Sequence, residues 1–192
     1  GSLLNEYKSF TYRNIYYDTV KSSYISQRYI PKRTIGELKL PARNFCGQYN
    51  EEGNIFVSAC QDRNIRLYDT SNHNNNFTEK EPYKIINTDN IGWSILDVDF
   101  SKDASVVIYS AWSRYVFLIS TLNDNNLHQS FDFYPDQHEI PANAFFSIQI
   151  SHDNNYILTG NNHYYINIYD INQEVVLETN TQAHENDINT VC

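Results

Sequence analysis

A threefold internal repeat is the feature of this sequence that most restricts its possible folds. Three segments, 44–69, 95–120 and 145–170, align with one another. Each contains three short runs of alternating apolar and polar residues, separated by polar turns, and the third runs end about 50 residues apart. Alternation with a period of two residues predicts β-strands. Recurrence at a fixed spacing indicates a repeat architecture.

A fourth, more polar run follows each unit, at 82–86, 128–132 and 174–178. Each unit is therefore predicted to be a four-stranded antiparallel sheet with its most polar strand outermost. One such sheet cannot bury both of its faces, whereas stacked sheets share a continuous core, as in a β-propeller. The expected fold is all-β, a partial propeller in residues 41–192. Its blades are expected at about 43–87, 93–133 and 144–179, with the start of another at 184–192.

The composition agrees with an all-β chain. The 192 residues include 16 Tyr and 10 Phe but no Met, and aromatic residues favour strands. No run of 18 apolar residues occurs, so no membrane-spanning helix is expected. Three cysteines, Cys46, Cys60 and Cys192, form no CxxC pair and no disulfide framework. This pattern predicts an intracellular protein of the nucleus, the cytoplasm or both, with Cys46 and Cys60 as buried thiols rather than zinc ligands.

Residues 1–40 do not fit the repeat and form a basic, Tyr-rich segment. The net charge of the chain is −9, yet residues 1–43 carry 8 Lys or Arg against 3 Asp or Glu. Basic residues interleaved with Tyr could bind single-stranded nucleic acid. Alternatively, the Tyr rings pack against the sheets, or the segment supplies an outer strand. The strongly acidic remainder argues against nucleic acid and anionic membranes as partners.

The segment 58–69 resembles the WD-repeat signature, with Tyr68 in place of the usual Trp. WD repeats build β-propellers. In that family a Ser or Thr, an Asp in a tight turn, the Trp and a loop His form a hydrogen-bonded network that braces the blade. The resemblance implies such a network from Ser58, Asp62 and Tyr68 in the first unit.

The third and fourth units match the signature in part. Thr159 and Tyr169 are the implied network members of the third unit, where His163 replaces the turn Asp. His184 resembles the loop His of a fourth unit. WD propellers typically have seven blades of ~40–45 residues, so three blades and one strand do not close such a ring. We expect the chain to be part of a longer protein or to take blades from another copy.

Longer blocks resemble one branch of the WD-repeat proteins, the factor-eleven (LEC14B-like) branch of the damage-binding-protein/cullin-4 associated factors. The blocks are 26–31, 45–49, 55–62, 92–98 and 109–113. Members of this family are substrate receptors of a ubiquitin ligase, in which the propeller holds the target and an adaptor links it to the cullin. The resemblance implies a substrate-receptor subunit of a cullin-4 RING E3 ligase. Its implied partners are the damage-binding adaptor and a protein substrate, and no cofactor is expected.

The sequence departs from this family at two positions. Family members often carry Arg two residues after the signature Asp, as an adaptor contact. Here Ser71 and Asn172 occupy those positions. Adaptor docking is therefore expected on other blades or on an amino-terminal segment.

One end of the blades is expected to bind the substrate, by the same resemblance. Turns between second and third strands, and loops entering first strands, fall on this end. The candidate partner-binding residues there are Arg63, Trp112, Arg114, Asn162 and His163. Trp and Arg are enriched among interface hot spots, which favours Trp112 and Arg114. Alternatively, Trp112 packs between blades.

The sequence contains none of three common catalytic motifs: it has no Gly-rich phosphate loop, no Gly-x-Ser-x-Gly and no His-Glu-x-x-His. No catalytic or metal-binding residue is predicted. Asp97 and Asp99 alternate on one face of a predicted first strand, where they could act as a carboxylate pair or simply be solvated. Two further function classes stay open: a WD-repeat scaffold for another complex and, least favoured, an enzyme that uses these carboxylates.

Overall fold

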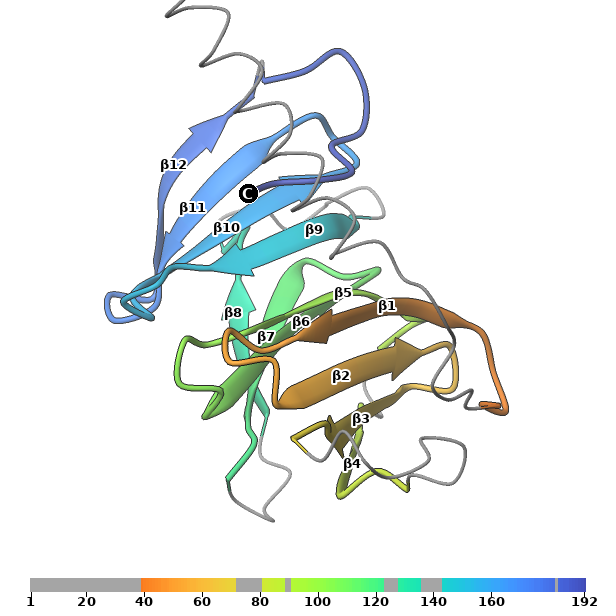
Figure 1. Cartoon of the computed structure of the whole chain (residues 1–192). Helices are drawn as coiled ribbons and strands as arrows, with labels where there is room; N and C mark the ends of the chain where they lie inside the picture. Colours follow the sequence, from red (N-terminus) through yellow and green to blue (C-terminus); the bar gives the residue numbers. More distant parts are fainter. Residues whose placement is uncertain (1–38, 72–80, 89–90, 123–127, 136–142, 182) are drawn as a thin grey trace, which may run out of the picture. The chain divides into compact units, whose positions relative to one another are not determined.

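The computed structural model describes residues 39–71, 81–88, 91–122, 128–135, 143–181 and 183–192. These residues form three four-stranded antiparallel sheets, which we call blades 1, 2 and 3 (Figure 1). Blade 1 comprises β1 (Asn44–Tyr49), β2 (Ile55–Cys60), β3 (Asn64–Asp69) and β4 (Lys84–Asn87). Blade 2 comprises β5 (Ile95–Phe100), β6 (Val106–Ala111), β7 (Tyr115–Ser120) and β8 (His128–Asp132). Blade 3 comprises β9 (Phe145–Ile150), β10 (Tyr156–Asn161), β11 (Ile166–Asp170) and β12 (Val175–Asn180).

The order of strands within each blade follows the order of the chain. The first strands, β1, β5 and β9, contact one another in succession. This arrangement confirms the predicted all-β fold, a partial WD-type propeller. Within the described residues, no helix is long and apolar enough to cross a membrane.

The turns between first and second strands have the same construction in all three blades. Their first residues, Asn50, Ser101 and Ser151, each accept a hydrogen bond through a side-chain oxygen from the amide five residues later. The fourth residue of each turn has a positive φ, and blade 1 meets this requirement with Gly53 at 70°. The repeated geometry shows why one pattern of polar residues recurs in the sequence.

Blade 2 is buried on both faces because alternate residues of its strands point to opposite neighbours. Val107 and Tyr109 belong to a core with Leu67 and other blade 1 residues. Ile108 belongs to a second core with Ile157 and other residues of blade 3. A strand buried on both faces reads as a nearly continuous apolar run, as residues 106–109 do.

The strand predicted at 184–192 is not formed: residues 183–192 contain no strand. A strand needs a hydrogen-bonded neighbour of its own blade, and none is described here. The segment nevertheless lies on blade 3, since Ile188 N donates to Asn161 O at 3.1 Å and Val191 N donates to Ser147 Oγ at 3.2 Å. The segment therefore contacts blade 3 as the first strand of a following blade would, although it belongs to no sheet among the described residues.

Candidate partner-binding face

Four aromatic side chains form a continuous row across the three blades. Ring centroids are 5.9 Å apart for Phe45 and Trp93, 6.4 Å for Trp93 and Trp112, and 5.9 Å for Trp112 and Phe146. The last two contacts are edge-to-face, at 72° and 84°, a favoured geometry for aromatic pairs. We call these four residues the aromatic strip.

The strip is exposed although its rings pack on one another. Phe45 is 44% exposed, Trp93 54% and Trp112 37%. Phe45 and Phe146 are the second residues of β1 and β9, Trp93 precedes β5, and Trp112 follows β6. The strip therefore lies at the end of the blades that carries the turns between second and third strands, which we call the bc face.

Trp112 packs edge-on against Phe146 of the next blade and is also exposed on the bc face. Sequence reasoning missed Phe45, Trp93 and Phe146 as its neighbours. The available signal was an aromatic residue at the same place in each unit: Phe45 and Phe146 correspond in the repeat, and Trp93 lies just before the matching strand.

Arg114 is engaged inside blade 2. Its Nε donates to Asp132 Oδ1 at 2.7 Å and its Nη2 donates to the carbonyl of Tyr134. The bond to Asp132 raises the pKa of the Arg114 guanidinium. Arg114 thus joins the turn between β6 and β7 to the end of β8 and the chain that follows it, and a partner would compete with those bonds.

Arg63 is exposed at the second-to-third-strand turn of blade 1, with a φ of 62°. Its carbonyl accepts bonds from the amide and hydroxyl of Thr88, at 2.9 and 2.8 Å. Arg43 lies beside this turn, since its carbonyl accepts a bond from Gln61 N at 2.8 Å. Two exposed arginines therefore flank the Phe45 end of the aromatic strip.

Asn162 and His163 lie in the corresponding turn of blade 3, at the Phe146 end. Asn162 Oδ1 accepts from Ala144 N at 2.9 Å, which links this turn to the residues before β9. The His163 ring lies 6.3 Å from that of Tyr165, and its Nε2 is buried with no hydrogen-bond partner in the described part of the chain. The structure thus places the candidate Arg63 at the blade 1 end of the bc face and Asn162 and His163 at the blade 3 end, with Trp112 between them and in contact with Phe146.

The turn carboxylate Asp62 pairs with Arg66 rather than with Ser58. Asp62 accepts a bidentate pair of bonds from the Arg66 guanidinium and a bond from Asn64 N at 3.2 Å. These bonds, led by the one from Arg66, lower the pKa of Asp62.

The Ser58 hydroxyl is buried and has no hydrogen-bond partner within the described residues. Tyr68 is buried beside Phe56, with ring centroids 6.4 Å apart, and burial raises its pKa.

In blade 3 the cross-strand bracing runs through an amide. Asn167 Nδ2 donates to Thr159 Oγ1 at 3.2 Å, and Asn167 Oδ1 accepts from Thr179 Oγ1 at 2.9 Å. The turn is held by Asn161, whose Oδ1 accepts from His163 N at 2.9 Å and from Tyr165 N at 3.0 Å. Asn161 was not among the predicted network residues. Its side-chain oxygen accepts amides of the turn, as the Asp62 carboxylate does in blade 1.

The remaining implied members of the bracing network have other surroundings. Tyr169 is 3% exposed and packs on Phe131 of β8 and on Phe133, which follows β8. The ring centroids are 5.3 and 4.8 Å from that of Tyr169. His184 is exposed on the segment that follows blade 3. Tyr169 therefore contributes to the core between blades 2 and 3 by packing.

Asp97 and Asp99 hold neighbouring blades together through their carboxylates. Asp97 Oδ2 accepts from Ile148 N, and Asp99 Oδ2 accepts from Ile150 N, both at 2.9 Å. Asp99 Oδ1 also accepts from Gln48 Nε2 at 2.9 Å, so Asp99 contacts all three blades. Burial raises the pKa of both carboxyls, against the lowering effect of these bonds.

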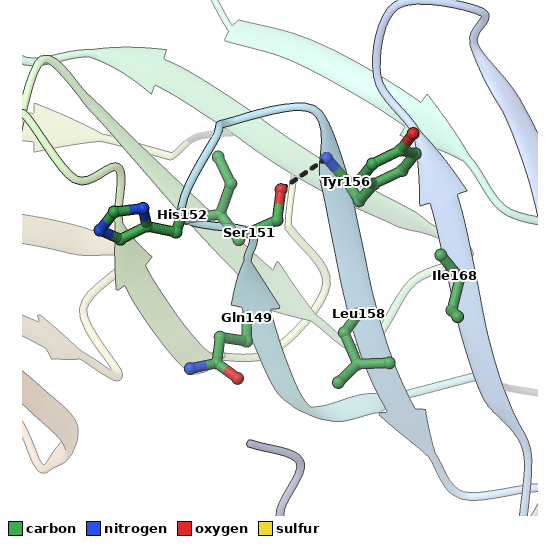
Figure 2. A pocket seen from close by; sticks show the side chains of 7 residues that line it. Gln149, Ser151, His152, Tyr156, Leu158 and Ile168 are labelled. Atoms are coloured by element: carbon green, nitrogen blue, oxygen red, sulfur yellow. Dashed lines mark hydrogen bonds between the residues drawn. The ribbon is translucent and has the colours of Figure 1, made fainter.

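Two hollows lie away from the aromatic strip. One, of about 420 Å³, is on the face of blade 3 opposite blade 2, where Leu158 and Ile168 project beside Tyr156, and Ser151 Oγ accepts from Tyr156 N at 2.9 Å (Figure 2). The other, of about 280 Å³, lies between the ends of β1, β5 and β9 and is lined mainly by polar residues such as Gln48, Lys102 and His152.

The two thiols of blade 1, Cys46 and Cys60, lie on the neighbouring strands β1 and β2. Cys60 is buried, and its Sγ contacts Asn44 Oδ1 at 3.4 Å. Burial, with the nearby Asp97 charge, raises the pKa of Cys46 to about 12. In the part of the chain that the structure describes, no group of three or more His, Cys, Asp or Glu side chains is placed to hold a metal ion.

Three consecutive four-stranded blades, joined along their first strands, define this chain as a partial β-propeller, consistent with the WD-repeat class. No family model matches the chain. It is 30% identical to the DDB1- and CUL4-associated factor 11 homolog of Caenorhabditis elegans, over 80% of this chain and 28% of that protein. It is 24% identical to the LEC14B protein of Lithospermum erythrorhizon, over 80% and 33% of the two chains.

A third relative, the DDB1- and CUL4-associated factor 11 homolog of Caenorhabditis briggsae, is 24% identical over 84% of this chain and 30% of its own length. These similarities confirm the resemblance found in the sequence. The chain spans about a third of the length of the curated relatives it matches.

Proposed function

We propose that this chain is part of a substrate-receptor subunit of a cullin-4 RING E3 ubiquitin ligase. The observation that carries the proposal is the 30% identity, over 80% of the chain, to a protein named as a DDB1- and CUL4-associated factor. The propeller fold and its exposed aromatic strip support a role in protein binding. In this role the partners are the damage-binding adaptor and a protein substrate, and the site of action is the nucleus or the cytoplasm.

An enzymatic role for the Asp97 and Asp99 pair has little support. A catalytic carboxylate needs an oxygen available to substrate or water within hydrogen-bond reach. Both Oδ2 atoms instead accept amide bonds from β9, and Asp99 is 7% exposed. The pair therefore has a structural role, and we propose a subunit that binds proteins rather than an enzyme.

A scaffold role in another complex is the second candidate, and a specific observation favours it. Ser71 and Asn172 stand where the resemblance implies adaptor-binding arginines. Their amides donate to Asp69 and Asp170, each at 2.8 Å, so both positions end a third strand in the same way. An Arg side chain at either position would be exposed to a partner, but this chain has Ser and Asn there.

Affinity purification of the gene product that contains this chain, from its own cells, separates the two candidates. Recovery of the adaptor together with cullin-4 in comparable amounts is the result expected for a ligase subunit. Recovery of a different stable complex without adaptor or cullin-4 would establish the scaffold role instead. Treatment with a proteasome inhibitor before lysis adds a readout, because substrates of a ligase receptor then accumulate in the purified material.

A further inference from the structure

We propose that the aromatic strip, together with Arg43 and Arg63, binds an extended peptide segment with apolar side chains and an acidic end. The inference rests on the proposed function, since it names the class of substrate segment that the receptor would recognise. The acidic end of the peptide lies at blade 1, and its apolar side chains lie along the strip toward blade 3.

The packing of the strip suits a binding surface. Each ring contacts the next, so Trp93 and Trp112 are held in place by their neighbours rather than by a partner. Trp93 is nevertheless 54% exposed, which is costly for a large apolar side chain that serves only the fold. Rigid, exposed aromatic anchors lose little entropy on binding, and Trp is enriched among interface hot spots.

The charges around the strip set the direction of the peptide. Two other arginines of the bc face, Arg66 and Arg114, are neutralised by Asp62 and Asp132. Arg43 and Arg63 have no ion pair within the described residues, although both are exposed at the Phe45 end. Beyond the other end, the segment that bonds to Asn161 carries the exposed acids Glu185 and Asp187. An acidic group is therefore attracted to blade 1 and repelled from blade 3.

A peptide fits these observations better than a single-stranded nucleic acid. Nucleic-acid platforms present ring faces for successive bases to stack on, along a cationic groove. Here two of the three neighbouring ring pairs of the strip stand edge to face, at 72° and 84°, and the Phe45–Trp93 pair is tilted by 48°. Two arginines without an ion pair in the described part of the chain, on a protein of net charge −9, give little counterion release. Gaps between tilted rings suit apolar side chains instead.

Selection from a library of random short peptides displayed on beads tests the proposal with the full chain as bait. The expected result is enrichment of peptides that carry Asp or Glu at one end and large apolar residues in the remainder. Enrichment of basic or purely polar peptides, or no enrichment over the starting library, would overturn the proposal. A labelled single-stranded oligothymidylate that binds the chain more tightly than any selected peptide would do the same.

Matched variants then locate the site, with the tightest selected peptide as the probe. Trp93→Ala should weaken binding at least about tenfold, whereas Tyr83→Ala, which removes an equally exposed ring outside the strip, should leave it unchanged. The double charge reversal Arg43→Glu with Arg63→Glu should weaken binding about fivefold or more at low salt, and less at high salt. Lys102→Glu, on the opposite end of the blades, is its control.

The charge-reversed variant keeps the test decisive if Trp93→Ala disturbs folding, because both arginines are exposed and outside the cores. Unchanged binding after charge reversal would contradict the assigned direction. Adaptor and cullin-4 binding is measured separately, so a strip that binds no peptide on a chain that still joins the ligase refutes this inference alone.

Discussion

The Asp99 carboxylate accepts a hydrogen bond from the Ile150 amide at 2.9 Å, across the boundary between blades 2 and 3. Gln48 of blade 1 donates to the other oxygen of the same carboxylate at 2.9 Å. First strands of neighbouring blades do not share a sheet, so their edge amides need other acceptors. The carboxylates of Asp97 and Asp99 supply them.

Asp99→Asn should lower the free energy of unfolding by about 1–3 kcal/mol. The variant loses a charged acceptor. If its Oδ1 keeps the bond from Ile150 N, its amide NH₂ faces Gln48, whose side-chain amide must turn over and accept through its oxygen. Urea unfolding followed by fluorescence measures the change. Glu51→Gln, an exposed carboxylate on a nearby turn, is the control. Equal stability of Asp99→Asn and the unmodified chain would show that the link between blades has no net effect.

The stability of the protein should depend on pH with opposite signs at Asp99 and Asp62. Burial raises the pKa of Asp99 above its ordinary 3.8, so its contribution is fully present below that value and declines as pH rises through the folded pKa. The Arg66 bond lowers the pKa of Asp62, so its contribution is present above 3.8 and is lost as pH falls through the folded pKa.

Unfolding of Asp99→Asn, Asp62→Asn and the unmodified chain at several pH values between 3 and 7 separates the two effects, where about 1.4 kcal/mol corresponds to one pKa unit. The stability difference caused by Asp99→Asn should shrink as pH rises. The difference caused by Asp62→Asn should shrink as pH falls. Parallel curves for both variants would contradict the assigned pKa directions.

Asp62→Ala should destabilise blade 1 by about 1–3 kcal/mol. Arg66 is 8% exposed, and loss of its partner leaves a nearly buried guanidinium without its carboxylate. The double variant Asp62→Ala with Arg66→Leu should recover part of the loss, because it removes the unpaired charge. A thermal melt of all variants gives the coupling energy. Additive losses would show that the two side chains do not depend on each other.

Gly160→Ala should displace the segment that follows blade 3. A Cβ at this position would lie 2.5 Å from Ile188 Cγ2 and 3.1 Å from Val191 Cγ1. The expected cost is about 1–3 kcal/mol, with faster hydrogen exchange at the amides of Ile188 and Val191. Gly92→Ala, where an added Cβ meets only the Trp112 carbonyl at 3.8 Å, is the control. Unchanged exchange at Ile188 would show that the segment does not rest on Gly160.

Ser71→Arg with Asn172→Arg should strengthen binding of the damage-binding adaptor. Each position ends a third strand, and a guanidinium there can add a charge-assisted bond of about 1.5–3 kcal/mol. Titration of the unmodified and doubly substituted chains with purified adaptor at physiological salt measures the gain. Tight binding of the unmodified chain would mean that docking uses other residues. No gain would mean that these strand ends do not face the adaptor.

The fold was predictable because its signals are local. Strand period and turn residues such as Gly53 and Asn50 act within a few residues of each other, and the sequence shows them directly. The pairing of Asp97 with Ile148 was not predictable. It joins residues 51 positions apart, and it depends on how two sheets are rotated against each other.

The candidate site was predicted in part for the same reason. The repeat placed Trp112 on the right turn, but its contacts with Trp93 and Phe146 arise only when three blades are side by side. The signature predicted that Asp62 bonds to Ser58 or to the backbone, and the bond from Asn64 N is of the second kind. Arg66 was missed because an Arg in a strand ordinarily points to solvent. The turn that separates it from Asp62 by four residues nevertheless brings its guanidinium back to the Asp62 carboxylate.

The bonds between blades also have a consequence for synthesis on the ribosome. Ile148 N donates to Asp97, and Val191 N donates to Ser147. In both hydrogen bonds the accepting side chain precedes the donating amide along the chain. In these two bonds the segment that emerges later thus meets an acceptor that is already folded. Blades can therefore be added one at a time in the order of translation, each using its predecessor as a template.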